Sequence, residues 1–168
     1  MADAQPGRRN GLRVLGHPAH AALAAFPLAL LSVSVVADGA GLLKGGDFWW
    51  RASFWAVVLG LCGALPTACA GLVDYAAIKE GHPATKTGMT HMLLMLTAVT
   101  FFGLDLLVRG GAAPPHGMAR LGIIALDAAG AVVLLIGGWY GGELVFAYGI
   151  GSAGEAPPAN VSPVGPPD

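Results

Sequence analysis

Residues 19–36, AHAALAAFPLALLSVSVV, form an apolar run that opens beside a histidine and contains one proline. A helix needs about 20 mostly apolar residues to cross a hydrocarbon core of about 30 Å. Three further runs, 52–75, 90–108 and 121–140, meet this criterion, and connections rich in glycine or proline separate them. We therefore predict an all-α fold, an integral membrane four-helix bundle.

The composition supports the membrane assignment. Of the 168 residues, 55% are hydrophobic and only 11% are charged, which is too apolar for an ordinary soluble domain. The few cations are scattered between the apolar runs, so nothing resembles a stripe that binds nucleic acid. There is no GxSxG elbow, Walker loop or GxGxxG motif, which disfavours a hydrolase or nucleotide-driven enzyme and favours a protein that is not an enzyme.

The two ends of the chain differ from its middle. We place the four-helix domain at residues 16–151 and predict disorder for the polar residues 1–15 and the Pro-rich residues 152–168. RRNGL and VVADGA together also suggest a cleaved signal peptide. Against cleavage, the first apolar run is longer than a usual signal core and starts beside a histidine, so we expect it to be retained.

Four spans place both termini on one side of the membrane, here called the N side. The N side carries five Lys and Arg residues and the opposite, or far, side carries four. The positive-inside rule therefore favours a cytoplasmic N side by a single residue. We therefore expect a multi-pass membrane protein with both termini on the cytoplasmic side.

Polar residues share one face of each predicted helix. Steps of three and four residues connect His20 to Asp38 on the first helix, and His91 to Asp105 and Arg109 on the third. Each of these helices thus has a histidine at the N side and an acid at the far side. The far side is predicted to gather three acids near three arginines: Asp38, Asp105, Asp127, Arg51, Arg109 and Arg120. The four-residue spacing of Asp105 and Arg109 predicts an ion pair.

His20 and His91 start parallel helices, so they are expected at the same depth in the membrane. Two inward imidazoles from different helices can be the axial ligands of a b-type haem, with Ala24, Ala98 and the glycines of the second and fourth helices leaving room. The alternative is that each imidazole bonds a carbonyl or lipid headgroup and holds no cofactor. The chain contains no CxxCH motif for a c-type haem.

His17 offers a second alternative, because it precedes His20 by three residues. If Pro18 occupies the first helical turn, both imidazoles lie on one helix face and can share a divalent metal ion. Such a site needs further ligands, for which the nearby choices are His82, His91 and Glu143.

Three segments of the chain resemble domain of unknown function family 2231, a group of small bacterial membrane proteins. They are GHPAHAALAAFPLALL, LPTACAGLVDYAAIKEGHPATKTGMTHMLLMLTAV and GWYGGELVFAYGIG, within residues 16–151. The opening is similar to the family pattern GHPLHPxLVxFPIG, although Ala21 stands where a second proline is common. The resemblance implies a four-span bundle. Some relatives are joined to Rieske iron-sulfur domains, which implies an electron-transfer setting but assigns no activity.

From these observations we form one main hypothesis and one rival. In the main hypothesis His20 and His91 ligate the iron of haem b, and His17 and Asp74 fix the imidazole tautomers. Electrons would be exchanged with a quinol or a peripheral redox protein. In the rival, a cofactor-free accessory bundle uses its polar face for a partner membrane protein or a second copy of the chain. A small transporter that uses the far-side acids is disfavoured, because no span contains an unwound centre.

Overall fold

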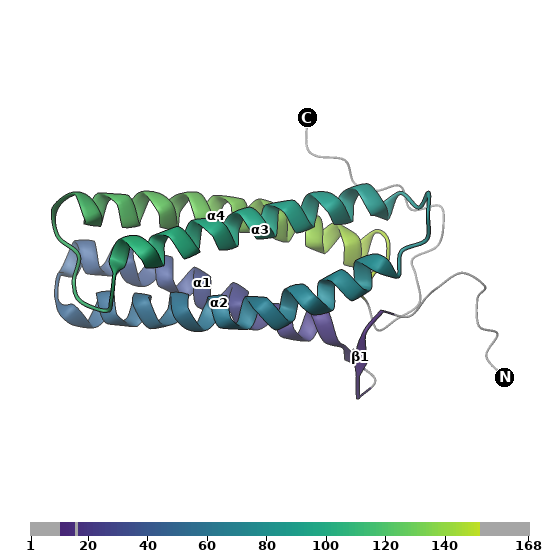
Figure 1. The fold of residues 1–168 in the computed structure, drawn as a ribbon, viewed down its shortest axis with the longest axis horizontal. Coiled ribbons are helices and arrows are strands. Elements are labelled where there is room, and N and C mark those ends of the chain that lie inside the picture. Colours follow the sequence, from purple (N-terminus) through teal and green to yellow (C-terminus); the bar gives the residue numbers. More distant parts are fainter. Residues whose placement is uncertain (1–10, 16, 152–168) are drawn as a thin grey trace.

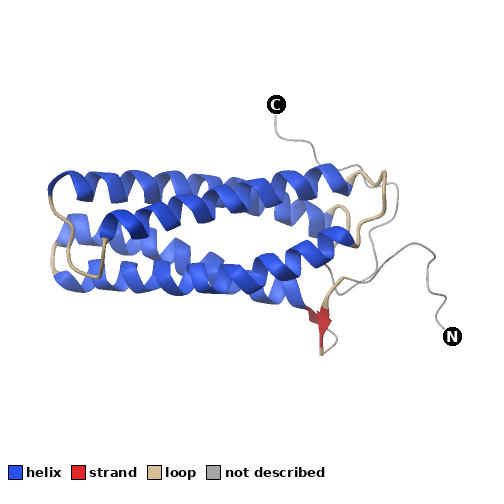
Figure 2. Ribbon diagram, in the orientation of Figure 1, coloured by secondary structure: helices blue, strands red, loops and turns tan. Residues whose placement is uncertain are grey.

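The computed structural model describes residues 11–15 and 17–151, and the described chain is almost entirely helical (Figure 2). Its four long helices are α1 Ala19–Lys44, α2 Asp47–Ala76, α3 Ala84–Arg109 and α4 Gly117–Phe146. All four are long and apolar enough to cross a membrane, which confirms the predicted all-α four-span bundle. Each helix includes one of the predicted apolar runs and continues beyond it.

The helices form two hairpins that lie side by side. Helix α1 packs along α2, and α3 packs along α4, whereas contacts between the two hairpins are fewer (Figure 1). Gly45 and Gly46 make the short far-side turn between α1 and α2, and both have positive φ angles of 68° and 88°. Gly110 ends α3 in the left-handed conformation, with its amide donating to the Leu106 carbonyl.

Close helix approach inside each hairpin depends on glycine. A Cβ atom on Gly60 of α2 would lie 2.8 Å from a methyl carbon of Leu31, and one on Gly130 of α4 would lie 2.9 Å from the Phe102 ring. Lipid tails are as apolar as leucine, so van der Waals contact at such small residues has to hold membrane helices together. These glycines therefore form the packing seams of the two hairpins.

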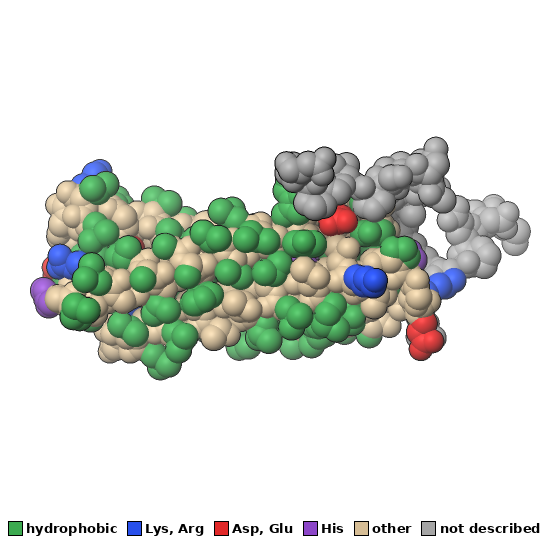
Figure 3. Space-filling model, turned by 90° about the horizontal axis from the view of Figure 1, so that it is seen from above, with side chains coloured by type: hydrophobic (Ala, Val, Ile, Leu, Met, Phe, Trp, Pro, Cys, Tyr) green, Lys and Arg blue, Asp and Glu red, His purple; other side chains and the backbone are tan. Residues whose placement is uncertain are grey.

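The bundle has a small apolar interior and an apolar exterior. Five residues form its central core: Leu31, Val57, Ala98, Phe102 and Leu134. Many large hydrophobic side chains point outward instead, among them Phe26, Leu65, Leu107 and Leu135. In Figure 3 hydrophobic side chains cover the length of the bundle, and charged side chains lie toward its two ends. This surface fits a lipid bilayer rather than water.

A small strand pair precedes α1 on the N side. Strand β1, Arg13–Val14, pairs antiparallel with β2, His17–Pro18, so part of the segment assigned to the N-terminal tail is hydrogen-bonded. Helix α1 starts only at Ala19, and Pro18 is its N-cap residue rather than a residue of its first turn. The remainder of the predicted tails, residues 1–10 and 152–168, lies outside the described residues.

We predict that Gly130→Ala destabilises the bundle. The added methyl group meets the buried Phe102 ring at 2.9 Å, which forces the two helices of the second hairpin apart. Thermal unfolding in mild detergent should show a midpoint lowered by about 5 °C. Gly103→Ala on α3 is the matched control, since nothing lies within 4 Å of its added methyl group. Equal midpoints for the two variants would contradict the close-approach argument.

Candidate functional site

Two histidines from different hairpins face each other near the N-side end of the bundle. His20 lies in the first turn of α1, and His91 lies two turns into α3. Their ring centroids are 6.3 Å apart, and the ring planes are nearly perpendicular at 83°. The structure thus brings together the two side chains that the sequence singled out, and both are half-buried.

Each imidazole is held by a backbone carbonyl of its hairpin partner. The Nδ1 atom of His20 lies 3.0 Å from the Thr67 carbonyl oxygen on α2, and Nδ1 of His91 lies 2.8 Å from the Gly137 carbonyl oxygen on α4. A carbonyl only accepts hydrogen bonds, so Nδ1 must carry the proton and donate in both cases. In the neutral ring this leaves Nε2 with a free lone pair, the tautomer of a metal-ligating histidine whose other nitrogen is anchored.

Glycine provides the space for both rings. A Cβ atom on Gly71 would lie 2.9 Å from Cε1 of His20, and one on Gly141 would lie 2.9 Å from Cε1 of His91. From the sequence we expected these glycines to make room for a macrocycle. In the structure they accommodate the imidazoles themselves, because the Nδ1–Cε1 edge of each ring points at the neighbouring helix, where Nδ1 reaches its carbonyl.

The two hairpins build this arrangement in the same way. In each, the accepting carbonyl lies four residues before the glycine that the ring packs on: Thr67 before Gly71, and Gly137 before Gly141. Leu31 and Phe102, which pack on the deeper glycines, follow their histidines by the same number of residues. The His pair therefore lies at the meeting point of two equivalent halves.

The other two predicted site residues lie elsewhere. Asp74 is buried near the end of α2, where its Oδ1 accepts a hydrogen bond of 2.8 Å from the Leu12 amide. It fixes the segment before β1, while backbone carbonyls orient the imidazoles. The tautomer-fixing role predicted for Asp74 is thus filled by groups that carry no side-chain signal in the sequence.

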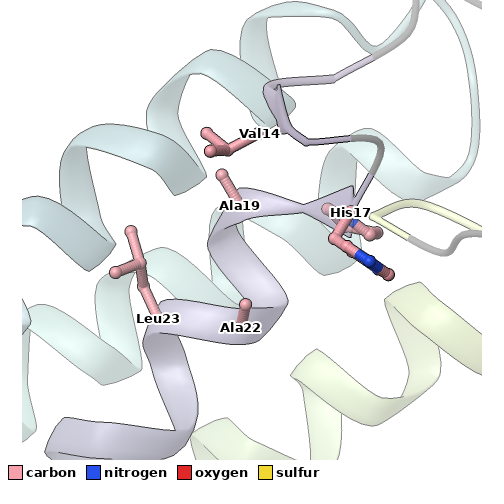
Figure 4. Close-up of a pocket in the computed structure, with 6 residues that line it drawn as sticks. Val14, His17, Ala19, Ala22 and Leu23 are labelled. Carbon is pink, nitrogen blue, oxygen red and sulfur yellow. The ribbon is translucent and has the colours of Figure 1, made fainter.

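His17 lies in β2 and is exposed. It borders an otherwise apolar pocket of about 240 Å³ whose other lining residues are Val14, Pro18, Ala19, Ala22 and Leu23 (Figure 4). Since His17 precedes the helix, it does not share a helical face with His20 as the divalent-metal hypothesis required. Within residues 11–15 and 17–151, no three His, Cys, Asp or Glu side chains form a group that could hold a metal ion.

The far end of the bundle contains a buried ion network. Arg109 donates through Nε to Asp105 at 2.7 Å, which confirms the predicted ion pair, and through Nη1 to Asp38 at 3.1 Å. Its Nη2 donates to the second Asp38 oxygen and lies 3.6 Å from Asp127. One arginine therefore serves all three predicted acids.

Arg51 and Arg120, which were expected to join this network, bind other groups. Arg51 pairs with Asp47 at 3.8 Å on the exposed surface. Arg120 donates to the Pro115 carbonyl and stacks over the Trp50 ring at 5.7 Å. Both arginines lie near the water boundary, where solvent and aromatic rings stabilise their charge at lower cost than burial would.

The chain belongs to the family described as "Predicted membrane protein (DUF2231)", which matches residues 16–154. This match confirms the resemblance seen in the three sequence segments. No curated protein and no solved structure matches the chain. The protein is therefore an integral membrane protein of a family that assigns it no activity.

We predict that His20 and His91 both carry their proton on Nδ1. Nitrogen-15 NMR of the histidine-labelled protein should show a proton on Nδ1 of both rings, because carbonyl oxygens can only accept. Gly141→Ala should displace the His91 resonances, since the new methyl group would meet Cε1 at 2.9 Å. Gly138→Ala, with nothing within 4 Å of its methyl group, should leave them unchanged. Protonation of either ring on Nε2 alone would refute the assignment.

Proposed function

We propose that the protein is a membrane-bound electron carrier that holds one b-type haem between His20 and His91. The observation that carries this proposal is the facing pair of imidazoles, each anchored through Nδ1 to a carbonyl of the adjacent helix. Anchoring of this kind orients a metal-bound histidine and raises its basicity. Bis-histidine ligation between helices of a bundle is a common way to hold haem.

The spacing of the rings is compatible with two bonds to one iron. Metal–imidazole bonds are about 2 Å long, so two imidazoles that would hold one metal ion have to lie close together. The centroid separation of 6.3 Å satisfies this requirement. Contacts between the hairpins are fewer than contacts within them, so the interface between α1/α2 and α3/α4 is the part of the bundle that would separate with least loss of packing.

In this proposal the chain supplies position and environment. His20 and His91 hold the group, the carbonyls of Thr67 and Gly137 fix their tautomers, and the apolar helices exclude water. A bound haem would supply reversible one-electron transfer, with a potential tuned by its axial ligands and by burial.

The position of the His pair suggests where electrons enter and leave. His20 lies in the first turn of α1, close to the N-side membrane surface. A quinol in the bilayer or a peripheral redox protein at that surface could approach the site, and the charge count favours a cytoplasmic N side in a bacterial inner membrane.

One observation favours a second function, that of a cofactor-free accessory bundle. Both imidazoles already have a hydrogen-bond partner, and their edge-to-face contact can serve simply to hold the hairpins together. The outward apolar side chains would then contact a partner membrane protein or a second copy of the chain.

Visible spectroscopy distinguishes the two functions. The protein purified in mild detergent from a haem-replete host should show Soret and α bands that sharpen on reduction with dithionite. His20→Ala and His91→Ala should each lower the haem content at least about tenfold, because each removes one of the two imidazoles that would hold the haem. His116→Ala, which removes an exposed histidine at the start of α4, is the matched control and should retain the haem. A colourless wild-type protein would exclude the haem proposal, as would full colour in both site variants.

A further inference from the structure

Four charged side chains form a cluster at the far end of the bundle, remote from the histidines. The cluster consists of Asp38 on α1, Asp105 and Arg109 on α3, and Asp127 on α4, and is called here the far-end cluster. None of these side chains is more than 2% exposed. Three acids thus share one guanidinium inside the bundle.

The hydrogen bonds of Arg109 are divided unequally among the acids. Its Nε binds Asp105, and both of its Nη atoms bind Asp38. Oδ2 of Asp127 lies 3.6 Å from Nη2 of Arg109, and this distance is too long for a hydrogen bond. Neither oxygen of Asp127 has a hydrogen-bond partner in the described part of the chain, and neither does Oδ1 of Asp105.

In the described helices, the ion pairs of the cluster include no Lys or Arg side chain other than Arg109. On α2, Asp47 and Arg51 pair with each other at the surface, and the nearby buried polar residue is the neutral Ser53. Arg120 of α4 is bound to the Pro115 carbonyl. If all three acids were ionised, two of their negative charges would remain uncompensated within the described bundle. Uncompensated buried charge is among the most costly features that a protein interior can contain.

We propose that the far-end cluster is a proton-binding site in which Asp127 carries the bound proton. A proton transferred from a hydronium ion breaks one O–H bond of that ion, releases water and forms an O–H bond on one Asp127 oxygen, which converts that group from a bare acceptor into a donor. Asp38 and Asp105 keep their hydrogen bonds to Arg109, and the added proton lowers the net negative charge of the cluster by one unit.

A proton fits this cluster better than a metal ion does. Its acids do not form a group that could coordinate a metal ion. Among the described residues, no three His, Cys, Asp or Glu side chains form such a group. A proton needs one acceptor and one donor atom, whereas hard cations take six or more oxygen ligands. The site is independent of the proposed haem and would exist in a cofactor-free bundle.

Infrared spectroscopy of the full-length protein labelled with carbon-13 at the aspartate carboxyl tests the proposal. At neutral pH the wild type should show the C=O stretching band of a protonated aspartic acid, which shifts in D₂O and on labelling. Asp127→Asn should remove this band. Asp74→Asn is the matched control, since it removes a buried carboxyl at the opposite end whose oxygen accepts from the Leu12 amide, and it should leave the band in place.

Stability measurements provide a second readout. Asp127→Asn should change the unfolding midpoint by less than about 3 °C, because an amide resembles a protonated carboxyl group in shape and charge. Asp38→Asn should lower it by about 10 °C, because it removes the main counter-charge of buried Arg109. Absence of the protonated band in the labelled wild type would overturn the proposal, as would its persistence in Asp127→Asn. A band present in choline chloride but lost in sodium chloride would also overturn it, in favour of a sodium site.

Discussion

Close backbone approach inside each hairpin is the constraint on which the rest of this structure depends. Helices in lipid gain little from burying apolar surface, so contact has to come from small residues that let another side chain reach the helix backbone. Gly60 and Gly130 receive Leu31 and Phe102 deep in the bundle. Nearer the N side, Gly71 and Gly141 leave space for the two imidazoles. Without this close approach the imidazoles could not reach carbonyls on the neighbouring helices.

The two hairpins are then joined by polar groups at both ends. At the N side His20 meets His91, and at the far side Asp38 binds Arg109 through two hydrogen bonds. Asp38 and Arg109 follow their histidines by the same number of residues, so equivalent positions of the two halves carry opposite charges. A ligand site at the junction of two parallel repeats is a recurring arrangement in membrane proteins.

The fold and the His pair could be predicted from the sequence, whereas the partners of those histidines could not. Four apolar runs determine the spans, and the three- and four-residue rhythm places His20 and His91 on inward faces at one depth. Their hydrogen-bond acceptors are backbone carbonyls, which every residue possesses, so a search for side-chain partners selected Asp74 instead. The sequence signal that could have indicated these contacts was the pair Gly71 and Gly141. These glycines occupy equivalent positions in the two halves, and the imidazoles pack on them. The prediction that Asp38, Asp105 and Asp127 gather at the far side was correct. Counting charges could not show that Arg109 would form ion pairs with all three.

The proposal that His20 and His91 hold one haem iron implies that both imidazole rings keep the orientation seen in the structure. Electron paramagnetic resonance of the oxidised, purified protein tests it most directly, since the signal of a ferric bis-histidine haem depends on the angle between the imidazole planes. With rings at 83°, we expect a low-spin signal of the strongly anisotropic type that perpendicular imidazole rings would produce. A high-spin signal, or no haem signal at all, would contradict it.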